Sequence, residues 1–389
     1  MEYPLRSNAS CSETYLYEKM KKIVSIKTLV AAAVAAVTMP VLATPSVSIY
    51  GKLEPEFQFK HTSYVNKAKG DAKNSFSMID GSSRFGLNIR EDLGNGYSIR
   101  GYLENGFKVD SGEMSSNGQL FNRRAILAVH SDKYGELGIG RMGSVDTIFG
   151  PYGQGLAALC PVRTGYGPDF SLDGMFASEL PQSSNSITYQ SPRVAGFQFA
   201  ATYSMQMQGQ ENDQVSENNR SFGSVLSYVN GPLTLVLGGS TIRWGNVDPD
   251  SSKFKNSSEL FAGVVYDPTP TVKLYAAIQR VEAWRQMFYT LAADTTKGID
   301  GMSYMVAARY QPIADTTLIG SYALFDGDKN TETDAEGKRH RINLGIEYNL
   351  SKRTMAYIMG AYHNNEGAIR KDTNVKSYIT TLVGIQHWF

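Results

Sequence analysis

Residues 341–350 read RINLGIEYNL, an unbroken alternation of large apolar side chains with polar or small ones. Because successive side chains on a β-strand point to opposite faces, this stretch has one apolar face and one polar face. The same alternation recurs at residues 302–311 and 197–204. Strands of this kind are typical of a soluble sandwich with its apolar faces inward, or of a membrane barrel with lipid outside and water inside.

The N-terminal region indicates export from the cytoplasm. Two lysines at 21–22 precede an apolar, alanine-rich run at 29–37, and the sequence VLA follows shortly after. This is the order of a secretory signal peptide, and the run is too short for a convincing membrane-spanning helix. Met20 is the natural start, so the preceding residues are interpreted as a mis-annotated extension, with a genuine extension as the alternative. The predicted division is extension 1–19, signal peptide 20–43 and folded domain 44–389.

The C-terminal region indicates insertion into an outer membrane. The chain stops at QHWF, residues 386–389, directly after another alternating segment. A strand that ends on an outward-facing Phe389 resembles the signal by which outer-membrane barrels are handed to their insertion machinery. Together with the signal peptide, this predicts a multi-pass protein of the cell outer membrane. Its expected partners are barrel-insertion machinery, outer-membrane lipid and lipopolysaccharide.

Connectors of two lengths divide the folded domain. The short ones are clusters of Gly, Pro, Asn and Asp of the hairpin type, at 92–96, 133–135, 193–196, 230–232, 267–270, 314–315 and 351–353. Longer polar stretches alternate with them, at about 61–78, 110–119, 144–183, 206–219, 245–257, 285–300, 326–338 and 364–376. Short turns on one side and long loops on the other are the plan of transmembrane barrels. The sequence therefore predicts an all-β fold, a 16-stranded antiparallel transmembrane β-barrel.

The third of the long connectors, residues 144–183, is much the longest. It carries many apolar side chains, among them Phe149, Leu156, Leu159 and Phe176. Structureless segments of this length are usually functional or disordered, and this much apolar surface argues against disorder. We expect this third loop to fold into the barrel and pack against its wall.

The charge balance and the chemistry-bearing residues exclude several classes of function. The chain has 38 Lys and Arg against 37 Asp and Glu, which argues against nucleic acid as a partner. Beyond the signal peptide, Cys160 is the one cysteine, so no intrachain disulfide is expected. The five His residues are dispersed, and neither a nucleophile elbow nor a phosphate-binding loop occurs. We predict no enzymatic activity, no metal and no cofactor.

Short motifs follow one another along the chain: VSIYGKL at 47–53, SRFG at 83–86, EDLGNG at 91–96, FNRRA at 121–125, GIGR at 138–141, NSI at 185–187 and YQSP at 189–192. In this order they resemble the trimeric general porins of Gram-negative outer membranes, along essentially the whole mature chain. The resemblance implies a homotrimer of water-filled barrels in which the third loop narrows each pore. It also implies passive diffusion of ions and small hydrophilic solutes.

The resemblance implies a basic side of the pore constriction. By motif, Lys52, Arg84 and Arg123 match basic wall positions of the family. Strand alternation places Lys52 and Arg84 on the inward face. Arg123 is followed directly by Arg124, and on a strand both cannot face the lumen.

The acidic side of the constriction departs from the family pattern, because the usual acidic motif of the third loop is missing. Asp146, Asp169, Asp173 and Glu179 are candidates by location only. A further basic position after the third loop is also unmet. Since a few charges at a narrow constriction outweigh the net charge, we expect a weak preference for anions.

Two other functions are compatible with the sequence. One is a structural or adhesive outer-membrane barrel whose loops bind other molecules. The other is a substrate-specific channel, for which Tyr152, Tyr166 and Phe170 in the third loop are candidate contacts.

The signal-peptide interpretation predicts that the mature protein begins at or near Thr44, because the small-residue exit site ends at Ala43. Mass spectrometry of the protein from outer membranes measures this directly. Retention of residues 1–43 in the mature protein would contradict it and would reopen the possibility of a helical anchor.

Overall fold

The computed structural model describes residues 45–66, 73–116, 118–176, 182–246, 254–285, 298–330 and 335–389. The predicted extension and signal peptide lie outside these residues, as do parts of several loops. In the described part of the chain, no helix has the length and apolar character needed to cross a membrane.

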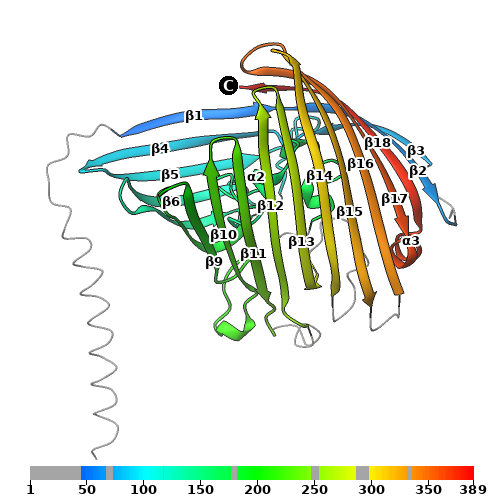
Figure 1. The fold of residues 1–389 in the computed structure, drawn as a ribbon. Coiled ribbons are helices and arrows are strands. Elements are labelled where there is room, and N and C mark those ends of the chain that lie inside the picture. Colours follow the sequence, from blue (N-terminus) through cyan, green and yellow to red (C-terminus); the bar gives the residue numbers. More distant parts are fainter. Residues whose placement is uncertain are drawn as a thin grey trace, which may run out of the picture.

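The described strands form one closed antiparallel sheet (Figure 1). β1 (Ser46–Leu53) and β2 (Pro55–Tyr64) are two parts of one strand that is interrupted at Glu54. β3 (Asn74–Asp80) and β4 (Arg84–Gly94) are likewise two parts of one strand. The pairing shows this, since β1 pairs with β4 and β2 pairs with β3. The other strands are β5 (Tyr97–Gly106), β6 (Arg124–Ser131), β7 (Gly135–Met142), β8 (Ser183–Gln190), β9 (Phe197–Ser204), β10 (Arg220–Asn230), β11 (Leu233–Arg243), β12 (Ser257–Thr269), β13 (Val272–Trp284), β14 (Ile299–Ile313), β15 (Thr316–Asn330), β16 (Ala335–Asn349), β17 (Thr354–Glu366) and β18 (Val375–Trp388).

The last strand closes the barrel. β18 pairs with both β1 and β2, and each interrupted strand counts once, so the eighteen strand segments described make sixteen strands. At this seam Gly51 N–H donates to Phe389 O at 3.2 Å, and Phe389 N–H donates to Gly51 O at 3.1 Å. Phe389 is 46% exposed on the outer face. The predicted 16-stranded barrel and the outward Phe389 are therefore confirmed, whereas its role as an insertion signal stays a prediction.

The predicted short turns all fall between consecutive strands. Between β4 and β5, Asn95 and Gly96 have φ of 52° and 77°, the left-handed values that a two-residue hairpin turn requires. Two predicted loops, however, are too long. The segment 61–78 loses residues to β2 and β3, and 326–338 loses most of its residues to β15 and β16. Backbone pairing continues there beyond the alternating pattern, because the hydrogen bonds between strands are made by backbone groups and do not require apolar side chains.

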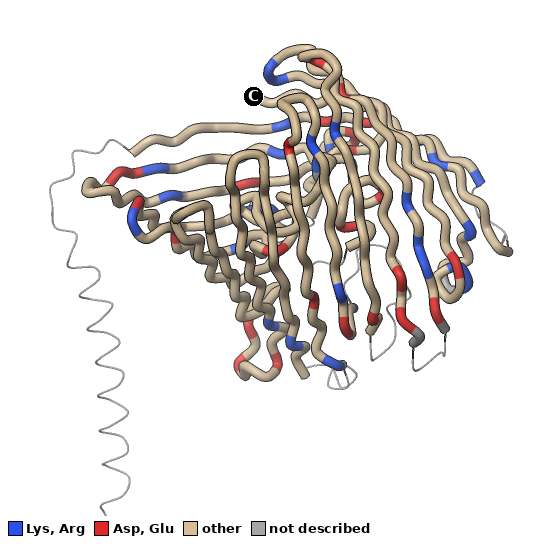
Figure 2. The backbone as a smooth tube through the Cα atoms, in the orientation of Figure 1, with Lys and Arg blue, Asp and Glu red and all other residues tan. Residues whose placement is uncertain are grey.

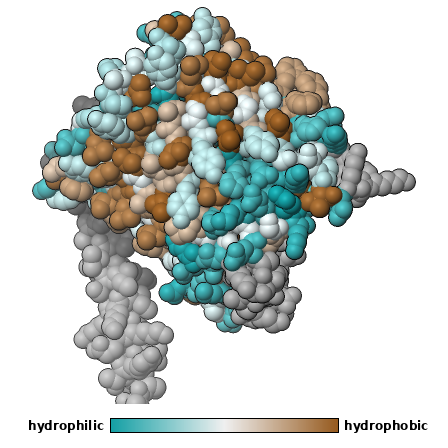
Figure 3. Space-filling view, turned by 45° about the vertical axis from the view of Figure 1, so that its right-hand side comes forward, coloured by the Kyte–Doolittle hydropathy of each residue, from teal (hydrophilic) through white to brown (hydrophobic). Residues whose placement is uncertain are grey.

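The outer face of the barrel is apolar. On β16, Leu344 is 66% exposed, whereas its neighbour Asn343 is fully buried. Figure 3 shows apolar residues spread over the strands, with hydrophilic residues gathered towards the lower end of the view. A soluble sandwich would bury the apolar face, so that alternative is excluded.

The inner face differs from the alternating expectation on one side of the barrel. β10 to β15 turn large apolar side chains inward, among them Val225, Phe261, Met305 and Phe325. The third loop covers them with its own buried residues, which include Leu156, Leu159, Leu172, Met175 and Phe176. The approach is close, because a Cβ added at Gly263 of β12 would meet both δ carbons of Leu159 at 2.6 Å. Residues of the third loop thus pack against the inner wall, and an apolar core lies between loop and wall.

Short helices complete the described connectors. α2 (Leu156–Leu159), η1 (Thr164–Tyr166) and η2 (Leu172–Gly174) lie in the third loop, η3 (Val215–Glu217) precedes β10, and α3 (Gly367–Thr373) joins β17 to β18.

Candidate pore constriction

Lys52 is held beneath the third loop. Its side chain on β1 is 2% exposed, pairs with Glu54 and donates to Gly81 O at 2.8 Å. The loop passes directly over it, since a Cβ added at Gly165 would come within 2.9 Å of Lys52 Nζ. Lys52 therefore faces inward as predicted, but the loop and Glu54 separate it from open water.

Two acidic residues beside Lys52 were missed by the sequence reasoning. Glu54 and Glu56 are almost fully buried, and the Tyr357 hydroxyl on β17 donates to both carboxylates, to Glu54 Oε1 at 3.2 Å. The ring of Tyr357 lies 4.5 Å from that of Tyr166 in the third loop. The alternation that turns Lys52 inward also turns Glu54 and Glu56 inward, so the signal was available.

Arg84 and Arg123 meet around one carboxylate, Glu104 of β5. Arg123 Nε lies 2.6 Å from Glu104 Oε1, and Arg84 Nε lies 3.7 Å from Glu104 Oε2. The Tyr50 hydroxyl also donates to Glu104 Oε2, at 2.8 Å. The Arg84 guanidinium stands 5.0 Å from the centre of the Trp388 ring. Two predicted residues thus form one cluster, in which the positive charges outnumber the negative charge.

Arg124 also faces the inside of the barrel, so the expectation that Arg123 and Arg124 exclude one another is wrong. Arg123 precedes β6, which begins at Arg124, and strand alternation therefore does not constrain it. Arg124 lines a cavity of about 110 Å³ with Arg100, Glu136 and Tyr152. Because Arg100 already pairs with Glu136 at 2.8 Å, Arg124 adds a further positive charge to this wall.

Asp169, one of the acidic candidates of the third loop, is turned towards the wall. Asp169 accepts hydrogen bonds from Thr380 Oγ1 at 2.7 Å and Tyr378 OH at 3.0 Å, and Lys60 Nζ lies 3.4 Å away. Burial opposes the ionisation of Asp169, but positive charge and these hydrogen bonds lower its pKa below the usual value. The loop is thereby tied to β18 and β2.

The other acidic candidates are also enclosed. Asp146 is fully buried beside Ser144 and Glu259, and this burial raises the pKa of its carboxyl. Asp173 is 6% exposed and accepts a hydrogen bond from Ser171. Glu179 lies outside the described residues.

Basic residues of the wall hold the loop backbone. Arg341 donates to Pro168 O at 3.0 Å and to Ser171 O at 2.6 Å, and Arg309 donates to Pro161 O at 2.8 Å. Asn343 adds a hydrogen bond to Phe170 O at 2.8 Å. These contacts join residues about 150 positions apart or more, and no local pattern in the sequence pointed to them.

One charged residue of the loop does face water. Arg163 is 45% exposed and lies 3.5 Å from Glu347 Oε1 on β16. Within residues 144–176, the other charged side chains are Asp146, Asp169 and Asp173, whose exposed fractions are 18% or less. Figure 2 shows Lys and Arg along β1, β4 and β5, with Asp and Glu also on β4 and β5, where Glu104 is only 5% exposed. The accessible charge of loop and wall is therefore mainly positive.

Comparisons with known proteins agree with this architecture. The family model described as Gram-negative porin matches residues 29–368. An outer membrane porin protein of Bordetella pertussis is 29% identical over 399 residues, covering 93% of this chain and 100% of the relative. The solved anion-selective porin from Comamonas acidovorans is 23% identical, with a TM-score of 0.63 over 89% of this chain and 100% of that one. The trimer form of OmpT from Vibrio cholerae is 17% identical, with a TM-score of 0.58 over 89% of this chain and 100% of that one.

The cluster around Glu104 predicts the effect of E104Q. Removing the carboxylate leaves Arg84 and Arg123 close together without their counter-charge, so we expect unfolding free energy to fall by about 1–3 kcal/mol. Urea unfolding in lipid vesicles measures this change.

The matched control is E113Q. Glu113 is 67% exposed and pairs with Lys108, which is 47% exposed. Such a surface pair contributes about 0–1 kcal/mol, so this variant should be near wild type. An equal loss of stability in both variants would show that the Glu104 cluster has no special role.

Proposed function

The chain belongs to the family of Gram-negative porins, and from that premise we propose that its constriction favours anions. As a porin it is a β-barrel channel of the Gram-negative outer membrane, through which ions and small hydrophilic solutes diffuse passively. The sign of its ion preference depends on which charges reach the water inside the barrel.

The observation that carries this proposal is the unequal exposure of opposite charges. Arg163 of the third loop is 45% exposed, and Arg123, which precedes β6, is 19% exposed. The described aspartates of the loop bond to the wall or to the loop itself. In a narrow, partly desolvated passage a charge acts through a lower dielectric constant than in bulk water, so these few residues decide the field. This field attracts anions.

The related solved structure supports the proposal at the level of the fold. It is named an anion-selective porin, so this kind of barrel is compatible with such a preference. In the present chain, the proposed preference rests on its own arginines, Arg163, Arg123 and Arg84.

Reversal potential in a salt gradient across a planar bilayer tests the proposal. We expect wild type to favour anions, and R84Q/R123Q to lower the anion-to-cation permeability ratio by about threefold to tenfold. R163Q should act in the same direction. Lys52 should contribute less than Arg123, because it is buried and paired with Glu54.

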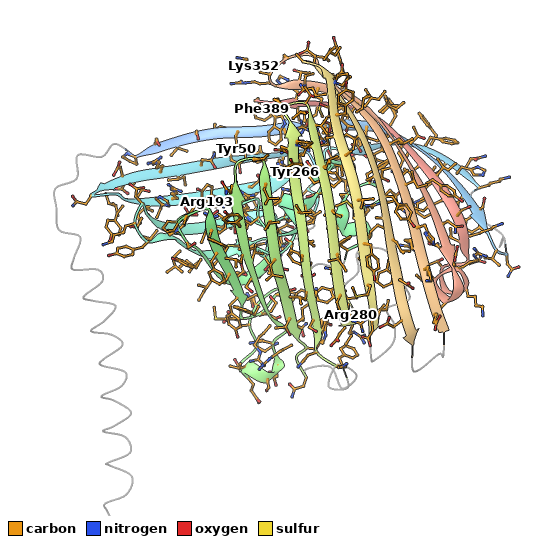
Figure 4. All side chains as sticks on the ribbon, viewed as in Figure 1. Tyr50, Arg193, Tyr266, Arg280, Lys352 and Phe389 are labelled. Atoms are coloured by element: carbon orange, nitrogen blue, oxygen red, sulfur yellow. The ribbon has the colours of Figure 1, made fainter. Side chains whose placement is uncertain are left out.

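R193Q is the control, since it removes one positive charge, as R163Q does, but far from the constriction. Arg193 lies at the short-turn end of the barrel (Figure 4), where it donates to Gly196 O and Gln198 Oε1. Its variant should keep the wild-type reversal potential. Cation preference in wild type, or an unmoved potential in R84Q/R123Q, would overturn the assignment of selectivity to these arginines.

We also propose that three such barrels assemble. The resemblance to trimeric porins supports this, as does the solved trimer form of OmpT. The outer face of the first strands carries strongly exposed apolar side chains, with Ile49 of β1 70% exposed and Phe76 of β3 72% exposed. Subunit contact would cover such side chains.

Light scattering in mild detergent, before and after heating, tests the assembly. A trimer that dissociates only on heating is expected. A stable monomer with full channel activity would contradict the proposal.

A further inference from the structure

A small pocket lies on the outer surface of the barrel, at the end where the long loops begin. Its lining includes Tyr203, Arg220, Phe222, Thr241 and Arg243, and its volume is about 300 Å³. Arg220 is the first residue of β10 and Arg243 the last of β11, and long connectors adjoin both. In transmembrane barrels the long loops face the cell exterior, so the pocket lies at the level of the outer leaflet.

Both arginines stand on the lipid-facing side. On β10, Arg220 shares the outward alternation with Phe222 and Leu226, which are 45% and 42% exposed. On β11, Arg243 shares it with Leu235 and Leu237. The side chains therefore form a basic rung directly above the apolar band. This is the depth at which the headgroups of membrane lipids lie.

The two positive charges lie directly opposite one another. Arg220 and Arg243 are register partners across β10 and β11, and like charges in that position destabilise a sheet. In the described part of the chain, no carboxylate forms an ion pair with either residue, and Arg220 Nε is buried without a hydrogen-bond partner. Among the residues that the structure describes, these two guanidinium groups thus have no counter-charge.

Another arginine on the same side shows the usual solution. Arg280 of β13, also near the long loops (Figure 4), lies 2.6 Å from Asp328 Oδ2. Its charge is matched within the protein. The contrast indicates that no residue the structure describes supplies the counter-charge for Arg220 and Arg243.

We propose that the phosphate group of an outer-leaflet lipid binds between Arg220 and Arg243. Guanidinium groups bind phosphate oxygens through paired, charge-assisted hydrogen bonds, and two of them match the charge of one phosphate. Tyr203 and Phe222, one rung below, provide an aromatic surface for the lipid portion beneath the phosphate. The proposal rests on the outer-membrane location of the porin and not on its ion preference.

Lipid binding by the intact, delipidated protein in zwitterionic detergent tests the site. Native mass spectrometry with diphosphorylated lipid A, and with the same lipid lacking phosphates, gives the two affinities. We expect wild type to prefer the phosphorylated form by about tenfold or more. R220Q/R243Q should bind both forms equally, whereas R280Q should keep the wild-type preference.

Thermal unfolding of the single variant R243Q gives a second measurement, which can be made even if the double variant R220Q/R243Q folds poorly. Without lipid, the single variant R243Q should unfold at the same or a higher temperature than wild type, because the like-charge repulsion is relieved. With phosphorylated lipid, wild type should gain more stability than R243Q. If Arg243 only stabilised the fold, R243Q would unfold at a lower temperature than wild type without lipid. That result would overturn the proposal.

Three further outcomes would also overturn it. If wild type and R220Q/R243Q prefer the phosphorylated lipid equally, the phosphate does not bind at these two arginines. If R280Q loses this preference as much as R220Q/R243Q does, the attraction comes from general surface charge. Protection by inorganic phosphate at the same concentration as the lipid would show a free-anion site instead. Conductance and reversal potential of R220Q/R243Q should stay at wild-type values, so failure of this proposal is distinguishable from failure of the proposed channel function.

Discussion

The apolar contact between the third loop and the inner wall is the interaction on which the rest of the pore depends. Leu159 lies against Gly263, and Phe176 lies among the inward side chains of the wall, so that apolar side chains fill one side of the barrel. A loop held in that way removes the adjoining strands from the aqueous path. Charged side chains that still reach water include Arg84 of β4, Arg123 at the start of β6 and Arg163 at the loop edge. The apolar core thus determines which charged residues remain in contact with water and can act on an ion.

The polar anchors of the loop explain why its acidic residues do not balance those arginines. A charge taken out of water needs a partner, and the wall supplies one to each described aspartate or encloses it with hydrogen-bonding neighbours. Asp169 is bound by Thr380 and Tyr378, and Arg341 fixes the backbone on either side of it. The negative charge that family resemblance would place in the pore is therefore used to hold the loop. Pore electrostatics and loop attachment are two consequences of one set of contacts.

The sequence predicted the features that local geometry controls. Alternation placed Leu344 outside and Asn343 inside, and the turn residues Asn95 and Gly96 marked a hairpin, so the sixteen-stranded barrel followed. It did not predict the apolar inner face at Phe261. Alternation shows which side chains lie on the same face of a strand, but it does not show what packs against that face. Nor did it predict the contacts of Asp169 with Thr380 or of Arg341 with Ser171, which join segments more than 150 residues apart. Arg123 and Arg124 both point inward because one of them lies before the strand begins, a boundary that a single sequence fixes poorly.

The same side chain has different consequences on the two faces of this wall. Inside, Arg123 and Arg163 face water, and their field acts on ions that pass and leave. Outside, Arg220 and Arg243 adjoin an apolar band, where an unmatched charge is costly, and there we propose a lipid phosphate as the counter-charge. The net charge of +1 for the whole chain predicts neither the field inside the pore nor the unmatched charge outside it. It adds together charges that face water and charges that face lipid. In a barrel, the face of the strand on which an arginine stands determines whether its charge meets the water of the pore or the surrounding lipid. The end of the strand determines the depth in the membrane at which the charge lies.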